Sequence, residues 1–211
     1  MQAPVARSLF IFSLLYGGMT VLAGVLGAKQ VALGPLAVEA GIFAFLLLVV
    51  LSSAVSELHG AGTGNSLVRW GFLPLLSAAA LTFLVIRLPT DEGMYEPAKE
   101  AFPIILGQTW RLMLAGVVAY GVSQTLNVLL FSRVLGRGRL VGLRAAVAGV
   151  ISQIVDTLLF ITIAFAGVRP IGELILGQAL AKTVLSALLV PILVVAFVRW
   201  GRRLDGEGAR G

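Results

Sequence analysis

Ionisable side chains occur inside long apolar runs of this sequence, at positions that water would not reach in a membrane. Arg111, Asp156 and Lys182 are each surrounded by apolar residues. An ionisable group in the middle of a membrane span costs about 2.5–3.5 kcal/mol on insertion scales, so by default it marks a binding site or a transport pathway. The competing interpretation is that such groups only bond across helices, which contributes about 0.6 kcal/mol each. The amides that accompany these charges are Gln124, Asn127, Gln153 and Gln178.

A duplicated motif favours the functional interpretation. Residues 123–131 read SQTLNVLLF and residues 152–160 read SQIVDTLLF. In a helix, positions three and four apart share one face. One predicted stripe contains Gln153, Asp156, Thr157 and Phe160, and the other contains Tyr120, Gln124, Asn127 and Phe131. An amide, a carboxylate or second amide, and an aromatic ring could together hold a planar heterocycle by its hydrogen-bonding edge and its face.

The two copies of the motif would lie upside down relative to each other, because successive membrane helices run in opposite directions. Gln124 lies nine residues before Arg133, and Gln153 lies nine residues after Arg144. At about 1.5 Å per residue both amides would be roughly 13 Å deep, near the middle of a hydrocarbon core about 30 Å thick. We therefore predict that the two amides face each other near the midplane, as motifs at solute sites of secondary transporters do.

The remaining buried charges need partners, because an uncompensated charge in a low dielectric is expensive. For Lys182 we predict Asp156 as the partner. For Arg111 two options stay open: its side chain extends outward to the interface, or it meets Glu173. Glu39 is predicted to lie near the outer end of its span, in contact with water.

Composition predicts the elements that must position these groups. The chain has 211 residues, of which 58% are hydrophobic and 12% charged, and its mean hydropathy is +0.99. These values indicate an integral membrane protein. Segments long enough to span a bilayer are 8–28, 33–53, 68–88, 104–131, 143–168 and 171–199. We predict an all-α polytopic protein with one transmembrane domain, 1–203, which could be a 3+3 inverted repeat, and a disordered tail, 204–211. Between the third and fourth spans, residues 95–102 could form a short interfacial helix.

The placement of Lys and Arg predicts the orientation. One side of the membrane would hold ten basic residues and the other four. The first group is Arg7, Arg69, Arg133, Arg137, Arg139, Arg144, Arg199, Arg202, Arg203 and Arg210, and the second is Lys29, Arg87, Lys99 and Arg169. By the positive-inside rule both termini would be cytoplasmic. The net charge of +6 therefore reflects topology and contact with anionic lipid headgroups, and we expect no nucleic-acid partner.

The sequence also argues against several chemistries. There is no cysteine, and His59 is the only histidine, so neither a thiolate site nor a zinc site is expected. No H-E-x-x-H motif and no G-x-x-x-x-G-K-[ST] loop occurs, which argues against a membrane-embedded protease and against ATP hydrolysis by this chain. We expect no metal, no cofactor and no enzymatic activity.

Several stretches resemble the queuosine precursor transporter family, part of the vitamin uptake transporter group of six-span bacterial inner-membrane proteins. The resemblance rests on SQIVDTLLFITIAFAG (152–167) and RLMLAGVVAYGVSQTLNVLLFSRV (111–134), with weaker support from VLGAKQVALG (25–34) and SELHG (56–60). It implies uptake of the deazaguanine bases preQ0 and preQ1. It carries family positions onto Arg111, Gln124, Gln153, Asp156, Thr157 and Lys182.

This chain departs from the family pattern at three positions. Ser53 and Asn127 stand where the family often has Asp, and His59 stands where it usually has Tyr. The loss of two carboxylates argues against a proton relay at those positions.

Two function classes remain open on the sequence. The first is an importer of a small purine-like base that works by itself. The alternative is a vitamin- or nucleobase-binding membrane subunit energised by a separate ATPase module. The mode of energy coupling and assembly into a homodimer are also left open.

Overall fold

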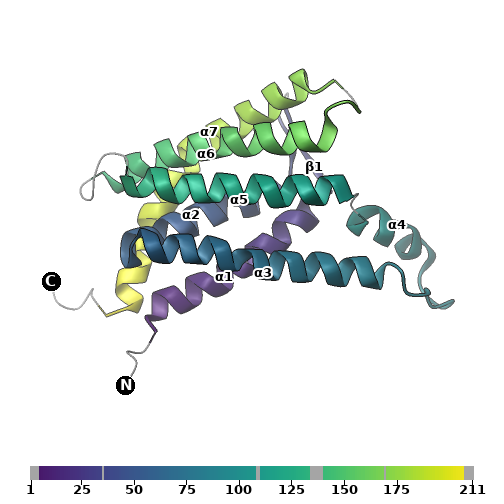
Figure 1. The fold of residues 1–211 in the computed structure, drawn as a ribbon, viewed down its shortest axis with the longest axis horizontal. Helices are drawn as coiled ribbons and strands as arrows, with labels where there is room; N and C mark the ends of the chain where they lie inside the picture. Colours follow the sequence, from purple (N-terminus) through teal and green to yellow (C-terminus); the bar gives the residue numbers. More distant parts are fainter. Residues whose placement is uncertain (1–4, 35, 108–109, 134–139, 169, 207–211) are drawn as a thin grey trace.

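The fold is a bundle of long apolar helices (Figure 1). The computed structural model describes residues 5–206 except 35, 108–109, 134–139 and 169. Six helices in the described part are long and apolar enough to cross a membrane, which confirms the predicted all-α polytopic class. They are α1 (Arg7–Leu26), α2 (Gly41–His59), α3 (Ala61–Val85), α5 (Trp110–Arg133), α6 (Val141–Phe165) and α7 (Gly172–Leu204).

Helix α2 is the central element of the bundle. It packs against α1, α3, α5 and α7, and most of its residues are buried. A helix that is apolar on all sides, as the run from Ile42 to Leu51 is, is stable only where protein or lipid surrounds it completely. The buried serines of α2 therefore face neighbouring helices, and they take part in the site described below.

The predicted second span, 33–53, is wrong at its beginning. Residues 30–39 form an antiparallel hairpin of β1 (Gln30–Leu33) and β2 (Leu36–Glu39), in which Val31 pairs with Val38. The backbone N–H of Ala40 donates to the carbonyl of Lys29 (2.8 Å) and closes the hairpin. Hydropathy cannot separate a short apolar strand from the start of a helix. The apolar residues of the hairpin from residue 33 onward therefore look like the start of the span.

Other boundaries also differ from the prediction. Helix α3 begins at Ala61 instead of residue 68, because Gly60 adopts a positive φ of 87° and turns the chain directly from α2 into α3. The predicted span 104–131 includes the end of α4 (Glu96–Leu106) and most of α5, since Gly107 leaves the helical region with ψ at 58°. The predicted short helix at 95–102 is confirmed as part of α4.

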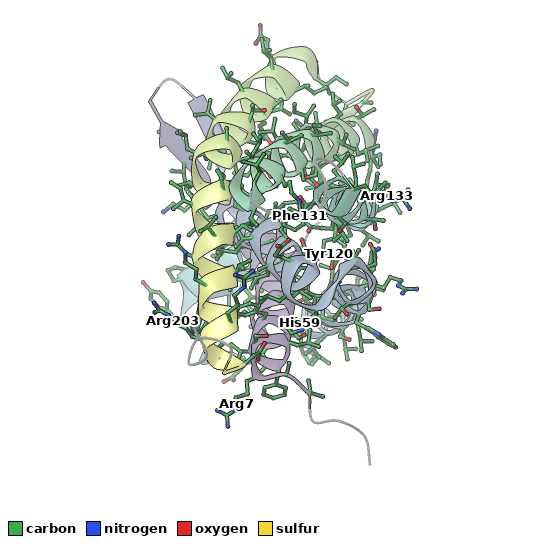
Figure 2. All side chains as sticks on the ribbon, turned by 90° about the vertical axis from the view of Figure 1, so that its left-hand side faces the viewer. Arg7, His59, Tyr120, Phe131, Arg133 and Arg203 are labelled. Carbon is green, nitrogen blue, oxygen red and sulfur yellow. The ribbon has the colours of Figure 1, made fainter. Side chains whose placement is uncertain are left out.

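Both described ends of the chain lie at the same end of the bundle. The Ser8 N–H and hydroxyl donate to the Asp205 carboxylate (2.9 and 2.6 Å), which joins the start of α1 to the residue after α7. Figure 2, a view onto this end, shows Arg7, Arg133 and Arg203 at its periphery. Of the predicted charge groups, Arg137, Arg139, Arg169 and Arg210 lie outside the described residues, as do residues 207–211 of the predicted tail.

Candidate functional site

An ion pair between α6 and α7 lies in the interior of the bundle. Lys182 Nζ is 3.0 Å from Asp156 Oδ2, and the two residues are only 6% and 4% exposed. The Ser123 hydroxyl on α5 donates to the other carboxylate oxygen, Oδ1, at 3.2 Å. The predicted partnership of Asp156 and Lys182 is thus confirmed, and each oxygen of the carboxylate already accepts one hydrogen bond.

The ion pair lies in the wall of a large cavity. This cavity has a volume of about 1030 Å³, at the upper end of the range for small-molecule sites. It is lined by the end of α1, the start of α2, the second half of α3, the segment 106–107 and the start of α5, so it lies toward the end of the bundle opposite Ser8 and Asp205. Most of its lining is apolar, and Asp156, Lys182 and Phe160 contribute to it from α6 and α7.

The two copies of the duplicated motif contact different helices. In the first copy, Gln124 Oε1 accepts a hydrogen bond from the Ser52 hydroxyl (3.3 Å). Asn127 Nδ2 donates to the hydroxyls of Ser52 (3.0 Å) and Ser53 (3.1 Å) and to the Val49 carbonyl (3.3 Å). The copies meet through Ser123 and Asp156, as described above. Gln124 is therefore directed to α2, and within the described part of the chain no hydrogen bond joins it to Gln153.

Asn127 and Ser53, two residues that differ from the family pattern, are in direct contact. The Asn127 amide nitrogen donates to the Ser53 hydroxyl. Where two carboxylates would repel each other or share a proton, this chain has a neutral amide and a neutral hydroxyl. The changes at the two positions therefore fit each other physically.

Gln153 is the least satisfied polar side chain of the predicted set. It is completely buried, and neither its amide nitrogen nor its oxygen has a hydrogen-bond partner among the described residues. Gln124 Nε2 and Asn127 Oδ1 also lack partners within that part of the chain. Leaving a buried polar group unpaired costs about 1–3 kcal/mol, so these three amides keep unused donors and acceptors, although none of them is in the lining of the large cavity.

The other predicted residues of the stripes differ in their surroundings. The Thr157 hydroxyl donates to the Gln153 backbone carbonyl (2.9 Å), as threonines in helices often do. Phe160 lines the cavity, and so does Tyr120, whose hydroxyl donates to the Val68 carbonyl (2.9 Å). Phe131 is fully buried and lies away from the cavity, under the guanidinium of Arg144.

Arg111 forms no ion pair with Glu173 among the described residues, and its guanidinium binds the end of α6 instead. Its Nε and Nη2 donate to the carbonyls of Ile163 and Ala166 (both 2.6 Å). These are among the last carbonyls of α6, which have no partner within the helix, and a cation there also interacts favourably with the helix dipole. Arg111 thus joins the start of α5 to the end of α6.

Glu39 is a polar residue of the cavity that sequence reasoning placed in water. It lines the cavity and accepts a hydrogen bond from Gln178 Nε2 (3.4 Å). Gln178 lies one helical turn before Lys182, so the carboxylate is brought toward the ion pair by the hairpin. The assignment of Glu39 to a helix hid this position, because only the hairpin places the end of β2 against α7.

A second buried ion pair joins Arg144 to Glu57. It was not predicted, because the place of Arg144 near the end of its span is typical of a surface charge. Arg144 is only 2% exposed. Its Nη1 donates to Glu57 Oε2 (2.9 Å) and its Nε to the Phe131 carbonyl (2.9 Å). The available signal was Glu57, the only carboxylate of the largely apolar α2, which needs a cation nearby.

Ser8, His59 and Asp205 have the residue types of a hydrolytic triad, but their geometry does not fit one. The Ser8 hydroxyl donates to Asp205, and the His59 Nε2 lies 2.7 Å from the same hydroxyl. In a triad the carboxylate binds the far ring nitrogen and the imidazole receives the serine proton. Here the serine proton is committed to the carboxylate, so these residues fasten α1, α2 and α7 together.

The comparisons with known proteins agree with a transport role for this arrangement. Residues 39–196 match the family described as "Putative vitamin uptake transporter". The "Probable queuosine precursor transporter" of Bacillus subtilis (strain 168) is 28% identical over 191 residues, covering 85% of this chain and 80% of that protein. No solved structure matches the chain significantly. Because the family match covers well over half of the sequence, the chain belongs to the vitamin uptake transporter family, and it is a multi-pass membrane transporter, not an enzyme.

Proposed function

We propose that this protein imports a deazaguanine base, such as preQ0 or preQ1, through the cavity that Asp156 and Lys182 line. The observation that carries the proposal is the buried carboxylate of Asp156 beside Phe160 at the wall of that cavity. The name of the Bacillus subtilis relative supports the substrate class.

The carboxylate geometry is suited to such a base. Each oxygen of Asp156 accepts one hydrogen bond, from Ser123 or from Lys182. A carboxylate has about four lone-pair sites, so one site on each oxygen remains. A deazaguanine carries two adjacent donors on one edge, which can bind both oxygens side by side as charge-assisted bonds. Phe160 then offers a surface for the ring, and Gln153, Gln124 and Asn127 have unused groups for the ring carbonyl and nitrogen.

The orientation that we propose has both termini in the cytoplasm of a bacterial cell, with the protein in the inner membrane. The sequence assigns ten basic residues to the side of Arg7, Arg133 and Arg203 (Figure 2) and four to the other, as the positive-inside rule requires of a cytoplasmic face. In this orientation the large cavity is on the outer half of the bundle, where a base from outside would enter.

The test is uptake in bacteria that cannot make queuosine precursors and lack their own importer. Cells producing this protein receive preQ0, preQ1, queuine or an unrelated vitamin, and queuosine in tRNA or accumulated label is measured. We expect uptake of at least one deazaguanine and none of the vitamin. Uptake of the vitamin with no uptake of any base would overturn the assignment of substrate.

The family description names vitamin uptake without naming an energy source, and the second candidate is a vitamin-binding subunit energised by a separate ATPase. Purified protein reconstituted alone into liposomes separates the two. Substrate accumulation or exchange without any added partner supports the importer, whereas binding without transport, restored by a copurifying ATPase, supports the subunit.

A further inference from the structure

A second, smaller cavity lies at the opposite end of the bundle from the large one. It has a volume of about 340 Å³ and lies between α2, α3, α5 and α6. Its polar lining comes from Ser56, Asn65, Ser132, Arg133 and Arg144. Neither Asn65 Oδ1 nor Ser132 Oγ has a hydrogen-bond partner among the described residues. The site proposed above does not use this cavity.

A row of buried polar side chains extends from the wall of the large cavity to the small one. It begins at Asp156 in the wall of the large cavity, which accepts a hydrogen bond from Ser123, and continues at Gln124, the next residue of α5. From there the Ser52 hydroxyl contacts Gln124 and Asn127. One turn further along α2, the Ser56 hydroxyl donates to the Ser52 carbonyl (2.6 Å) and lines the small cavity.

This row is not packed like a structural polar network. Such networks satisfy nearly all of their buried groups, because an unpaired group in a low dielectric is costly. Here Gln124 and Asn127 each keep a buried atom without a partner in the described part of the protein. A polar solute that passes between the two cavities loses its hydrogen bonds to water. The unused donors and acceptors of the row could replace them.

A compact layer of three residues lies beside Ser56, at the small-cavity end of the row. Phe131 and Glu57 each lie four residues, one helical turn, after Asn127 and Ser53. The Arg144 guanidinium lies over the Phe131 ring, 4.3 Å from its centroid, and forms an ion pair with Glu57 (2.9 Å). Phe131 is fully buried, and the layer joins α2, α5 and α6 at this end of the row.

We propose that the small cavity is the exit of the transport path and that Glu57, Phe131 and Arg144 form the gate that closes it. This inference rests on the proposed transport function and adds its route and gate. With the large cavity accessible and the gate closed, the structure corresponds to a state open to one side only, as alternating access requires. Opening separates α2 from α5 and α6, and water entering from the small cavity then solvates both charges of the gate.

The chain has no cysteine, so single cysteines can report water access without any background. Ser132→Cys lies in the small cavity and Thr82→Cys in the large one. A membrane-impermeant thiol reagent should label the two from opposite faces, in inside-out and right-side-out vesicles. Thr125→Cys, exposed on α5 and lining neither cavity, should stay unlabelled from both faces. Failure to label Ser132→Cys from either face would overturn the exit.

The gate itself is tested with Ser53→Cys, one turn above it. From the face that labels Ser132→Cys, Ser53→Cys should react slowly. Phe131→Leu or Glu57→Gln should each speed that reaction about tenfold, which corresponds to weakening closure by about 1.4 kcal/mol. An unchanged rate in both backgrounds would overturn the gate, and two variants are used so that one poorly folded protein does not decide the outcome. The labelling needs no substrate, so it is independent of the uptake assay, and a wrong substrate assignment would leave its result unaltered.

Discussion

Lys182 Nζ and Asp156 Oδ2 are 3.0 Å apart across the α6–α7 interface, and both side chains are nearly excluded from solvent. Removing one member of such a pair leaves the other charge buried and costs about 3–5 kcal/mol. We expect Asp156→Asn and Lys182→Met each to abolish uptake and to lower thermal stability in detergent.

The double variant Asp156→Asn/Lys182→Met separates pairing from independent roles. Because it leaves no unpaired charge, its loss of stability should be smaller than the sum of the two single losses. Uptake should remain absent, since the carboxylate is missing. Strictly additive losses, or normal uptake by Asp156→Asn, would contradict the site.

Gln153→Leu should separate function from stability. The amide makes no hydrogen bond within the described part of the protein, so an apolar side chain of similar size should leave stability unchanged or raise it by about 1 kcal/mol. Uptake should fall sharply if the amide binds the solute. The matched control is Gln178→Leu, which removes a bond to Glu39 and should lower stability. If the Gln153→Leu protein were destabilised but kept full uptake, the amide would serve the stability of the fold and not solute binding.

Arg111→Met should destabilise the protein, because it removes two hydrogen bonds to the end of α6. Bonds from charged donors contribute about 1.5–3 kcal/mol, and thermal unfolding in detergent measures the loss. We expect Arg111→Lys to restore part of the stability. Uptake per folded molecule should be retained in Arg111→Lys; its complete loss in a stable Arg111→Lys protein would instead indicate contact with the solute.

The carboxyl group of Asp205 makes the stability of the folded protein depend on pH. Burial alone would raise the pKa of its carboxyl, but hydrogen bonds from Ser8 and the nearby His59 outweigh burial and hold the pKa below its usual value. A lowered folded-state pKa stabilises the fold above the unfolded-state value, about 3.9, and that stabilisation is lost as the pH falls through the folded-state pKa.

The corresponding measurement is the melting temperature of Asp205→Asn and of the unaltered protein at pH 7 and near pH 3. The difference between them should be clear at pH 7 and should shrink in acid. Asp91→Asn, in an exposed loop, is the control and should behave like the unaltered protein at both values. A difference that persists in acid would show that Asp205 acts without its charge.

The span count, the partnership of Asp156 with Lys182 and the polar stripes could be predicted from the sequence. Each follows from local rules, because apolar length predicts a span and a buried charge requires an opposite one. Boundaries were less predictable. The strands β1 and β2 are as apolar as the start of a membrane helix, so hydropathy does not separate them from α2. Helix α3 begins directly after Gly60, before its apolar run begins.

Whether a charge near a span end is buried or exposed was also hard to predict from the sequence. Arg144 is near the end of its span, as a surface charge would be, and only the approach of α2 shows that it binds Glu57.

The sequence by itself determined a membrane protein with six candidate spans in its described part, and it places a carboxylate, a lysine and several amides within them, because composition and periodicity along one helix are local properties. Apart from the pair of Asp156 and Lys182, only the tertiary structure decided which groups meet. Ser123 with Asp156, Asn127 with Ser53 and Glu39 with Gln178 each join different elements. Their contact depends on how helices rotate and pack around α2, and that rotation is set by the shapes of many side chains at once.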